Sequence, residues 1–136
     1  MAFLNWTGDF SVGVAAFDRE HMGLIAIINE LHENMQAGQG KDVVGTVIKK
    51  LIDYTGRHFE HEEIELRRHG YPLLREHHAQ HEALKAKVGE FHNRLTIGFS
   101  GLIAIEMLRF LKTWLQQHIQ QEDKQYGRFL NGKGIR

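Results

Sequence analysis

The stretch KDVVGTVIKKLIDYTGRHFEHEEIELRRHGYPLLREHHAQHEALKAKVGEFHNRL, residues 41–95, is the most informative part of the chain because it contains two amphipathic helices and one break. Apolar residues recur every three or four positions on both sides of His69-Gly70-Tyr71-Pro72, which is the period of a helix buried along one face. Pro72 is preorganised for a first helical turn, so the second of these helices is expected to begin there. A connection this short favours an antiparallel pair.

A similar helix is predicted on each side of this pair. The first follows Asp18 as its N-cap and ends at Gly38-Gln39-Gly40. The last follows Ser100 as its N-cap and continues through an apolar stripe to His118. The sequence therefore predicts four long helices joined by short turns.

We predict an all-α protein, an up-down-up-down antiparallel four-helix bundle with an N-terminal arm and a short C-terminal helix. Its 136 residues are the size of one domain. The arm covers about residues 1–17 and is expected to be anchored by Trp6 and Phe10. The bundle covers about residues 18–121, and the C-terminal segment about 122–136.

Charge and composition exclude several classes of protein. The 17 basic residues balance the 17 acidic ones, and no basic run is long enough to hold nucleic acid or anionic lipid. Apolar runs such as residues 102–105 are far too short to span a bilayer. The absence of cysteine excludes disulfides, thiolate metal sites and cysteine nucleophiles. We expect no nucleic-acid partner, no membrane insertion and a cytoplasmic location.

The chain contains 10 histidines, and histidine is the commonest metal-binding side chain. Some of these histidines replace apolar residues on the predicted inward faces. In an antiparallel pair, residues equidistant from the turn lie at one height, so their midpoint falls in the connection. Such midpoints fall in Gly38-Gln39-Gly40, at His69-Gly70 and between Gly98 and Phe99. One layer of the core is therefore expected to contain His21, His58, Glu62, His77, His81 and His118.

A buried layer of imidazoles and carboxylate needs polar partners, and metal cations supply them. These donors exceed the four of a closed tetrahedral zinc site, so two ions bridged by carboxylate fit better. Nitrogen and oxygen donors without sulfur suit iron, manganese, zinc or copper, of which we prefer iron. No glutamate stands three residues before a histidine, which disfavours the carboxylate-rich ferritin-like class.

Four motifs follow one another along the chain: Phe17-Asp18-Arg19-Glu20-His21, His58-Phe59 with Glu62-Glu63, Tyr71-Pro72 with His77 and His81, and Trp114-Leu115 with His118 and Asp123. Together they resemble the haemerythrin family, in particular its bacterial single-domain branch, the bacteriohaemerythrins. The resemblance extends from about Trp6 to Phe129. It implies a four-helix bundle that holds two non-haem iron ions, joined by an oxo or hydroxo group, and binds dioxygen reversibly.

The ligands that the resemblance implies are His21, His58, Glu62, His77, His81, His118 and Asp123. Asp123 lies five residues after His118, and an ideal helix would turn it about 140° away. Glu122, four residues after His118, would suit a regular helix better. The family pattern nevertheless selects Asp123, which implies a π-like turn or a break just after His118.

The resemblance also implies that one iron ion lacks a ligand. Glu62 and Asp123 would bridge both ions. Three histidines would complete the coordination of one ion, whereas the other ion, bound by His21 and His58, would lack one ligand. Dioxygen would bind at that position, inside a dry pocket. The residues expected to form the pocket are Leu115, Ile119, Trp114 and Phe59.

The expected function is reversible oxygen binding for storage, delivery or sensing, without enzymatic activity and with no indicated protein recipient. The alternative is a di-iron enzyme, such as an oxidase, a peroxidase or a nitric oxide scavenger, that uses the same open position. Such an enzyme needs a proton donor beyond the ligands, and none is predicted at their level.

Two further features have no place in this site. Gly56 lies inside a predicted helix, where glycine costs about 1 kcal/mol relative to alanine, and a close helix contact would explain it. The remaining histidines are expected to be exposed or locally hydrogen-bonded, with no assigned function: His32, His61, His69, His78 and His92.

Overall fold

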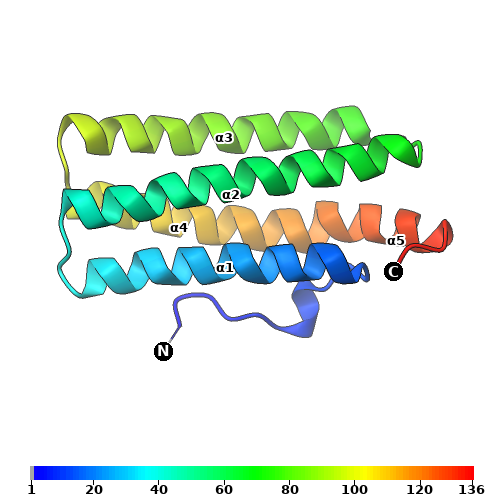
Figure 1. Cartoon of the computed structure of the whole chain (residues 1–136), viewed down its shortest axis with the longest axis horizontal. Coiled ribbons are helices and arrows are strands. Elements are labelled where there is room, and N and C mark those ends of the chain that lie inside the picture. The colour runs from blue at the N-terminus through cyan, green and yellow to red at the C-terminus, as the bar shows by residue number, and fades with distance from the viewer. Residues whose placement is uncertain (1) are drawn as a thin grey trace.

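The computed structural model describes residues 2–136, and this part of the chain is helical with no strand. Four long helices run alternately in opposite directions along the longest axis of the molecule (Figure 1). They are α1 (Ala15–Gln36), α2 (Lys41–Arg68), α3 (Leu74–Ile97) and α4 (Gly101–Gln117). Helix α1 contacts α2 and α4, and α3 contacts the same two helices, so the four close a ring. The predicted all-α four-helix bundle is confirmed.

The core follows the stripes that the sequence predicts, because positions three and four apart share one helix face. In α2, every residue of the predicted stripe is buried, from Val44 to Leu66. Near the helix ends, the apolar residues Met35 and Leu74 are only partly buried. The buried layer that interrupts this apolar core is polar: it contains histidines, Glu62 and Asp123.

Two predicted helix starts are wrong. Helix α1 begins at Ala15, because the Asp18 carboxylate does not cap it but accepts hydrogen bonds from the Val12 N–H at 2.8 Å and the Ser11 hydroxyl at 2.6 Å. Helix α3 begins at Leu74 rather than Pro72. Ser100 caps α4 as predicted, with its side chain accepting from the Ile103 N–H.

The N-terminal arm lies along the bundle beside α1 (Figure 1) and contains one short helical turn, η1 (Gly8–Phe10). Phe10 is buried and stacks on the partly buried Trp6, with ring centroids 5.8 Å apart, so the arm is held where the sequence indicated. Gly127 packs against the Val12 carbonyl so closely that a Cβ would lie 1.9 Å from its oxygen. The arm therefore also closes the end of the bundle near Gly127.

The helix after α4 changes its winding. A π-helical segment, η2 (His118–Asp123), joins α4 to α5 (Lys124–Gly132). A π-helix has more residues per turn than an α-helix, so residues five apart share a face. This winding is what the five-residue spacing of His118 and Asp123 requires if both side chains are to lie on the same face.

Across residues 2–136, none of the helices combines the length and the apolar character that crossing a membrane requires.

Candidate metal centre

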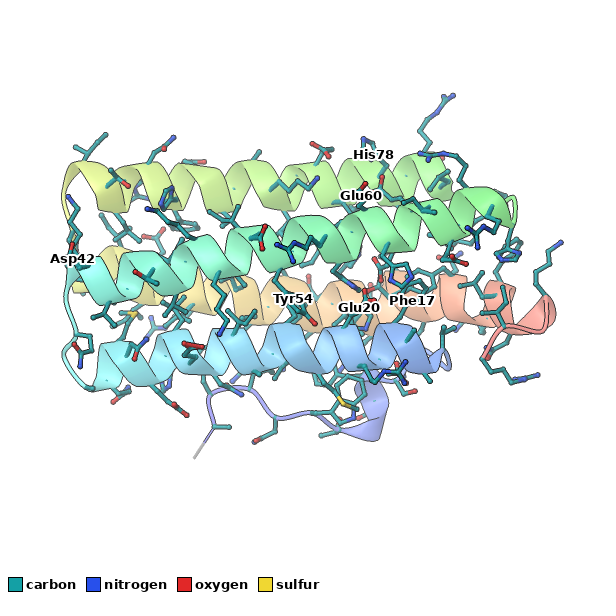
Figure 2. The ribbon with its side chains drawn as sticks, viewed as in Figure 1. Phe17, Glu20, Asp42, Tyr54, Glu60 and His78 are labelled. Carbon is teal, nitrogen blue, oxygen red and sulfur yellow. The ribbon has the colours of Figure 1, made fainter. Side chains whose placement is uncertain are left out.

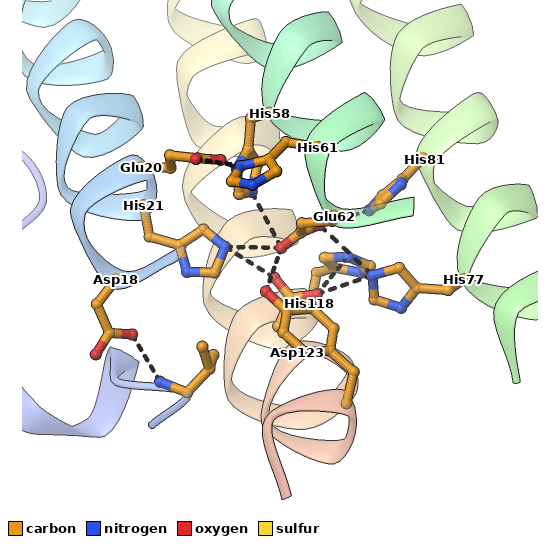
Figure 3. A network of polar contacts seen from close by, with 12 residues as sticks. Asp18, Glu20, His21, His58, His61, Glu62, His77, His81, His118 and Asp123 are labelled. Carbon is orange, nitrogen blue, oxygen red and sulfur yellow. Dashed lines mark hydrogen bonds and ion pairs between the residues drawn. The ribbon is translucent and has the colours of Figure 1, made fainter. Parts of the chain in front are cut away.

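All seven side chains that the family resemblance implies as ligands lie at one level inside the bundle (Figure 3). None is more than 5% exposed. Helix α1 positions His21, α2 positions His58 and Glu62, α3 positions His77 and His81, and η2 positions His118 and Asp123. Glu62 comes one turn after His58 on the same face, as His81 does after His77, because both pairs are four residues apart. Asp123 reaches the layer only because η2 is π-helical.

The imidazoles form two groups, each with donor atoms close enough together to hold one metal ion. The first contains His21 and His58 with Glu62, and its donor atoms lie within 4.8 Å of one another. The second contains three imidazoles and a carboxylate within the same limit: His77, His81, His118 and Asp123.

Each of the two carboxylates joins both imidazole groups. Glu62 presents Oε2 to the Nε2 atoms of His21 and His58, at 3.3 and 3.2 Å. Its other oxygen, Oε1, lies 3.2 Å from the Nε2 atom of His81. Asp123 likewise presents Oδ2 to His21 at 3.1 Å and Oδ1 to His118 at 3.0 Å. Two carboxylates that each face two groups in this way have the arrangement of bridging ligands.

Several donor atoms face one another without the hydrogen-bond geometry that buried polar atoms normally have. In the described chain, these buried atoms make no hydrogen bond: Glu62 Oε1, His77 Nε2, His81 Nε2, His118 Nε2 and Asp123 Oδ1. Leaving one buried polar atom unpaired costs about 1–3 kcal/mol. Five such atoms aimed at a common centre fit a metal site, because cations satisfy nitrogen and carboxylate oxygen donors together.

In the metal-free cluster, the nearby carboxylates favour the protonated form of the imidazoles. Burial lowers the pKa of His58, but the Glu62 and Glu20 carboxylates outweigh it and raise this pKa to about 10. Burial likewise lowers the pKa of His77, and Asp123 and Glu62 reverse the effect and raise it to about 10. Burial raises the pKa of Glu62, yet the surrounding imidazoles hold it well below its ordinary value. Protons on these imidazoles would balance the charge of the buried carboxylates in the absence of a metal ion.

Two further carboxylates form hydrogen bonds with two of the imidazoles, at the ring nitrogen that faces away from the centre. Glu20 of α1 lies 2.6 Å from His58 Nδ1, and Glu63 of α2 lies 2.8 Å from His81 Nδ1. An ionised carboxylate accepts the Nδ1 proton, which leaves the opposite nitrogen, Nε2, free to face the centre. The sequence pointed to Glu63 only as a neighbour of a ligand and did not single out Glu20.

Each of these carboxylates also bonds a histidine at the surface. Glu20 accepts from His61 Nδ1 at 2.5 Å and Glu63 from His78 Nδ1 at 2.6 Å. Figure 2 shows Glu20 where α1 meets α2, and His78 on α3. Both histidines are partly exposed, as predicted, but their hydrogen bonds are not local, and through these carboxylates they connect to the site.

Tyr126 of α5 is a site residue that the sequence analysis missed. It is completely buried, and its hydroxyl donates a hydrogen bond to Glu62 Oε2. Burial and the nearby Glu62 raise its pKa well above the ordinary value, so it keeps its proton. Its position three residues after Asp123, on the next turn of the same face, is the signal that could have identified it.

The predicted pocket residues lie in and beside the layer. Phe59 stacks on the His81 ring at 3.7 Å, and Trp114 stacks on the His118 ring at 4.2 Å. Leu115 and Ile119 are buried. The two aromatic rings thus cover imidazoles of the three-histidine group, whereas the resemblance implies the open position at the other group.

Comparison with known proteins gives a family match over most of the chain. Residues 12–130 match the family described as "Hemerythrin HHE cation binding domain". A bacteriohemerythrin from Stenotrophomonas maltophilia is 34% identical over 126 residues, which cover 93% of this chain and 80% of that protein. One from Methylococcus capsulatus is 30% identical over 128 residues, with 93% and 96% covered.

A solved structure has the same fold. The crystal structure of a wild-type hemerythrin superposes with a TM-score of 0.86 at 30% sequence identity, covering 93% of this chain and 97% of the other. The matched residues include both imidazole groups and the two carboxylates, Glu62 and Asp123, that face both groups. Family match, relatives and fold agree with the geometry of the buried centre, and the chain therefore belongs to the haemerythrin family.

Proposed function

We propose that this chain binds dioxygen reversibly at a centre of two non-haem iron ions, for oxygen storage, delivery or sensing in the cytoplasm. One observation carries the proposal: two buried carboxylates each present one oxygen to each of two imidazole groups. One ion would be held by His21 and His58, the other by His77, His81 and His118, and both by Glu62 and Asp123.

When bound, two iron ions supply two electrons and an open coordination position for dioxygen. The chain would supply two imidazoles to one ion and three to the other, so the open position would lie beside His21 and His58. The donor set contains nitrogen and oxygen and no sulfur, which suits iron. Burial of every ligand excludes water and external acids, a condition for releasing dioxygen unchanged.

Tyr126 bears on the alternative, a di-iron enzyme. The prediction from the sequence that no acid beyond the ligands lies in this layer is wrong, because the Tyr126 hydroxyl lies there. Its proton is held by Glu62 and its pKa is raised well above the ordinary value, mainly by burial. Such a group donates its proton poorly at neutral pH, which favours a carrier over an enzyme.

Absorption spectroscopy tests this proposal. The protein is loaded with Fe(II) without oxygen, exposed to air and then deoxygenated. We expect a charge-transfer band that appears with air and disappears when oxygen is removed. The variant His58→Ala should keep its helical circular dichroism and lose iron and the band. A band that persists after deoxygenation, or steady turnover of an added reductant with oxygen, would overturn reversible binding.

A further inference from the structure

A chain of hydrogen bonds connects the proposed ligand His58 to the surface between α1 and α2. His61 lies 2.5 Å from Glu20, and the other oxygen of Glu20 lies 2.6 Å from His58. The exposed fraction of the side chain falls along this series, from 42% for His61 to 26% for Glu20 and 2% for His58. Figure 3 shows the Glu20 carboxylate between α1 and the rings of His58 and His61. Each step from solvent to the two-imidazole group therefore offers a nitrogen or a carboxylate oxygen, the donors that suit iron.

A hollow in the surface reaches this chain. It has a volume of about 170 Å³ and is lined by Glu20, Tyr54, Arg57 and the ligand His58. One water needs about 10–15 Å³ of such space, so the hollow has room for an ion with several waters. Gly23 of α1 makes room for the Tyr54 wall, because a Cβ at this position would lie 2.2 Å from the Tyr54 hydroxyl oxygen. The hollow therefore gives small ions from solvent access to one side of a buried ligand.

The single basic side chain of this hollow opposes a cation only weakly. Arg57 is ion-paired with Asp53 at 2.8 Å, and the two side chains are 79% and 61% exposed. Water and salt screen charges that are so exposed. The Glu20 carboxylate is less exposed and lies next to His58. It is therefore the charge that acts most strongly on an ion in the hollow.

A second chain has the same order of groups but lacks this access. His78 lies 2.6 Å from Glu63, and Glu63 lies 2.8 Å from His81. Glu63 is only 12% exposed. The neighbouring hollow, of about 260 Å³, is lined by no proposed ligand, and its two glutamates are matched by two basic side chains, Arg67 and Lys85. This side of the bundle therefore repeats the hydrogen bonds without an acidic path to a ligand.

Gly56 of α2 also lines the second hollow. A Cβ placed on Gly56 would meet no atom within 4 Å outside the local backbone. The close helix contact that the sequence suggested for Gly56 is therefore wrong. This glycine leaves free space at the surface, but none of the residues around that space belongs to the proposed ligands.

We propose that His61 and Glu20 form a transfer site through which iron reaches the centre, a role that rests on the proposed function. In the described chain, these two residues belong to no group of three or more donors, whereas each half of the centre has at least three. Two donors bind an ion weakly enough to pass it on. Glu20 contacts His58 through its second oxygen. An ion that takes the place of the proton between them gains the first buried ligand, and the proton leaves through the hollow.

The rate of iron uptake tests this proposal without any oxygen chemistry. Metal-free protein is mixed with Fe(II) in the absence of oxygen, and unbound iron is trapped at timed intervals by a coloured chelator. In His61→Gln, we expect uptake to slow by about tenfold, which corresponds to about 1.4 kcal/mol lost at the transfer site. The final iron content should stay unchanged, because His61 is not a proposed ligand. His78→Gln is the matched control, because it removes the equivalent surface imidazole of the second chain and should keep the uptake rate.

Iron release separates a transfer site from a merely structural contact. A transfer site lowers the barrier in both directions. Release from His61→Gln to an excess of chelator should therefore slow by the same factor as uptake, with the affinity unchanged. If His61 only orients Glu20, His61→Gln should release iron faster, as should His78→Gln through Glu63. Faster release, or equal changes in the two variants, would overturn the proposal.

A charge change in the hollow gives a test in the opposite direction. Arg57→Glu removes a positive charge beside Glu20 and adds a negative one, so uptake should become faster, and the gain should shrink as salt is added. Arg67→Glu makes the same change at the second hollow and should keep the uptake rate. Unchanged uptake in either His61→Gln or Arg57→Glu, with normal iron content, would overturn the transfer site alone. Failure of the unsubstituted protein to bind iron would instead overturn the proposed function, and the transfer site with it.

Discussion

Glu20 and Glu63 each bond two imidazoles, one of a proposed ligand and one at the surface. The ring of a ligand histidine is oriented through its second nitrogen, so these carboxylates determine where the Nε2 atoms of His58 and His81 point. Each carboxylate has its two oxygens bonded, which restricts rotation about its own side chain. The outer histidines therefore act on the site through these carboxylates.

The variants Glu20→Gln and Glu63→Gln should each weaken iron binding by about 10–100-fold, because an amide accepts the imidazole proton less strongly than a carboxylate. Iron loss to a competing chelator measures this effect. Glu60→Gln is the control, because Glu60 is exposed on the same helix as Glu63. Equal iron retention in all three variants would contradict the assigned role of the two carboxylates.

Removing the Tyr126 hydroxyl should destabilise the metal-free protein. Tyr126→Phe keeps the buried ring and removes the hydroxyl that donates to Glu62, which costs about 1.5–3 kcal/mol for a bond to a charged group. Tyr54→Phe is the control, because the Tyr54 hydroxyl donates to the uncharged backbone carbonyl of Glu20 at 2.7 Å. The loss of stability in this variant should therefore be smaller, about 0.5–1.5 kcal/mol. Urea unfolding measures both values, and the reverse order would exclude this role for Tyr126.

At the scale of the element, the π-helical segment determines which acidic residue joins the centre. A regular helix would place residue 122 on the face of His118, whereas η2 buries Asp123 there and leaves Glu122 partly exposed. We expect Asp123→Asn to lose at least one of two iron ions per chain and Glu122→Gln to keep both. Iron analysis, with circular dichroism to verify folding, measures this. Loss of iron only in Glu122→Gln would mean that the helix winds regularly in solution.

The four helices and their inward faces could be predicted because helix period and short connections constrain an antiparallel bundle strongly. The π turn could be expected only because the family pattern selects Asp123, since the spacing alone favours Glu122. The start of α1 was predicted wrongly because Asp18 bonds the arm instead of capping the helix. The roles of Glu20 and Tyr126 could not be predicted, because their partners, His58 and Glu62, lie far away in the sequence.

At the scale of the whole molecule, the polar layer makes the stability of the metal-free bundle depend on pH. The folded pKa values of His58 and His77 are raised from 6.5 to about 10. A group whose folded pKa is raised contributes stability that is full below its unfolded pKa and is lost as the pH rises through the folded value. Between pH 7 and pH 10, the free energy of unfolding of the metal-free protein should therefore fall.

Urea unfolding of the metal-free protein at pH 6.5, 8 and 10 measures this loss. His92→Gln is the control, because His92 lies outside the layer and its loss should leave the pH profile unchanged. A stability that stays constant between pH 8 and pH 10 would show that these imidazoles are already neutral in the folded protein, and would contradict the raised pKa values.

The proposed function requires two iron ions bridged by Glu62 and Asp123. Anomalous X-ray diffraction at the iron absorption edge, on crystals of the Fe(II)-loaded protein, locates these ions directly. We expect two peaks per chain, one among His21, His58 and Glu62 and the other among His77, His81, His118 and Asp123, with both carboxylates between them. A single peak with four ligands, or no peak within this layer, would contradict the account.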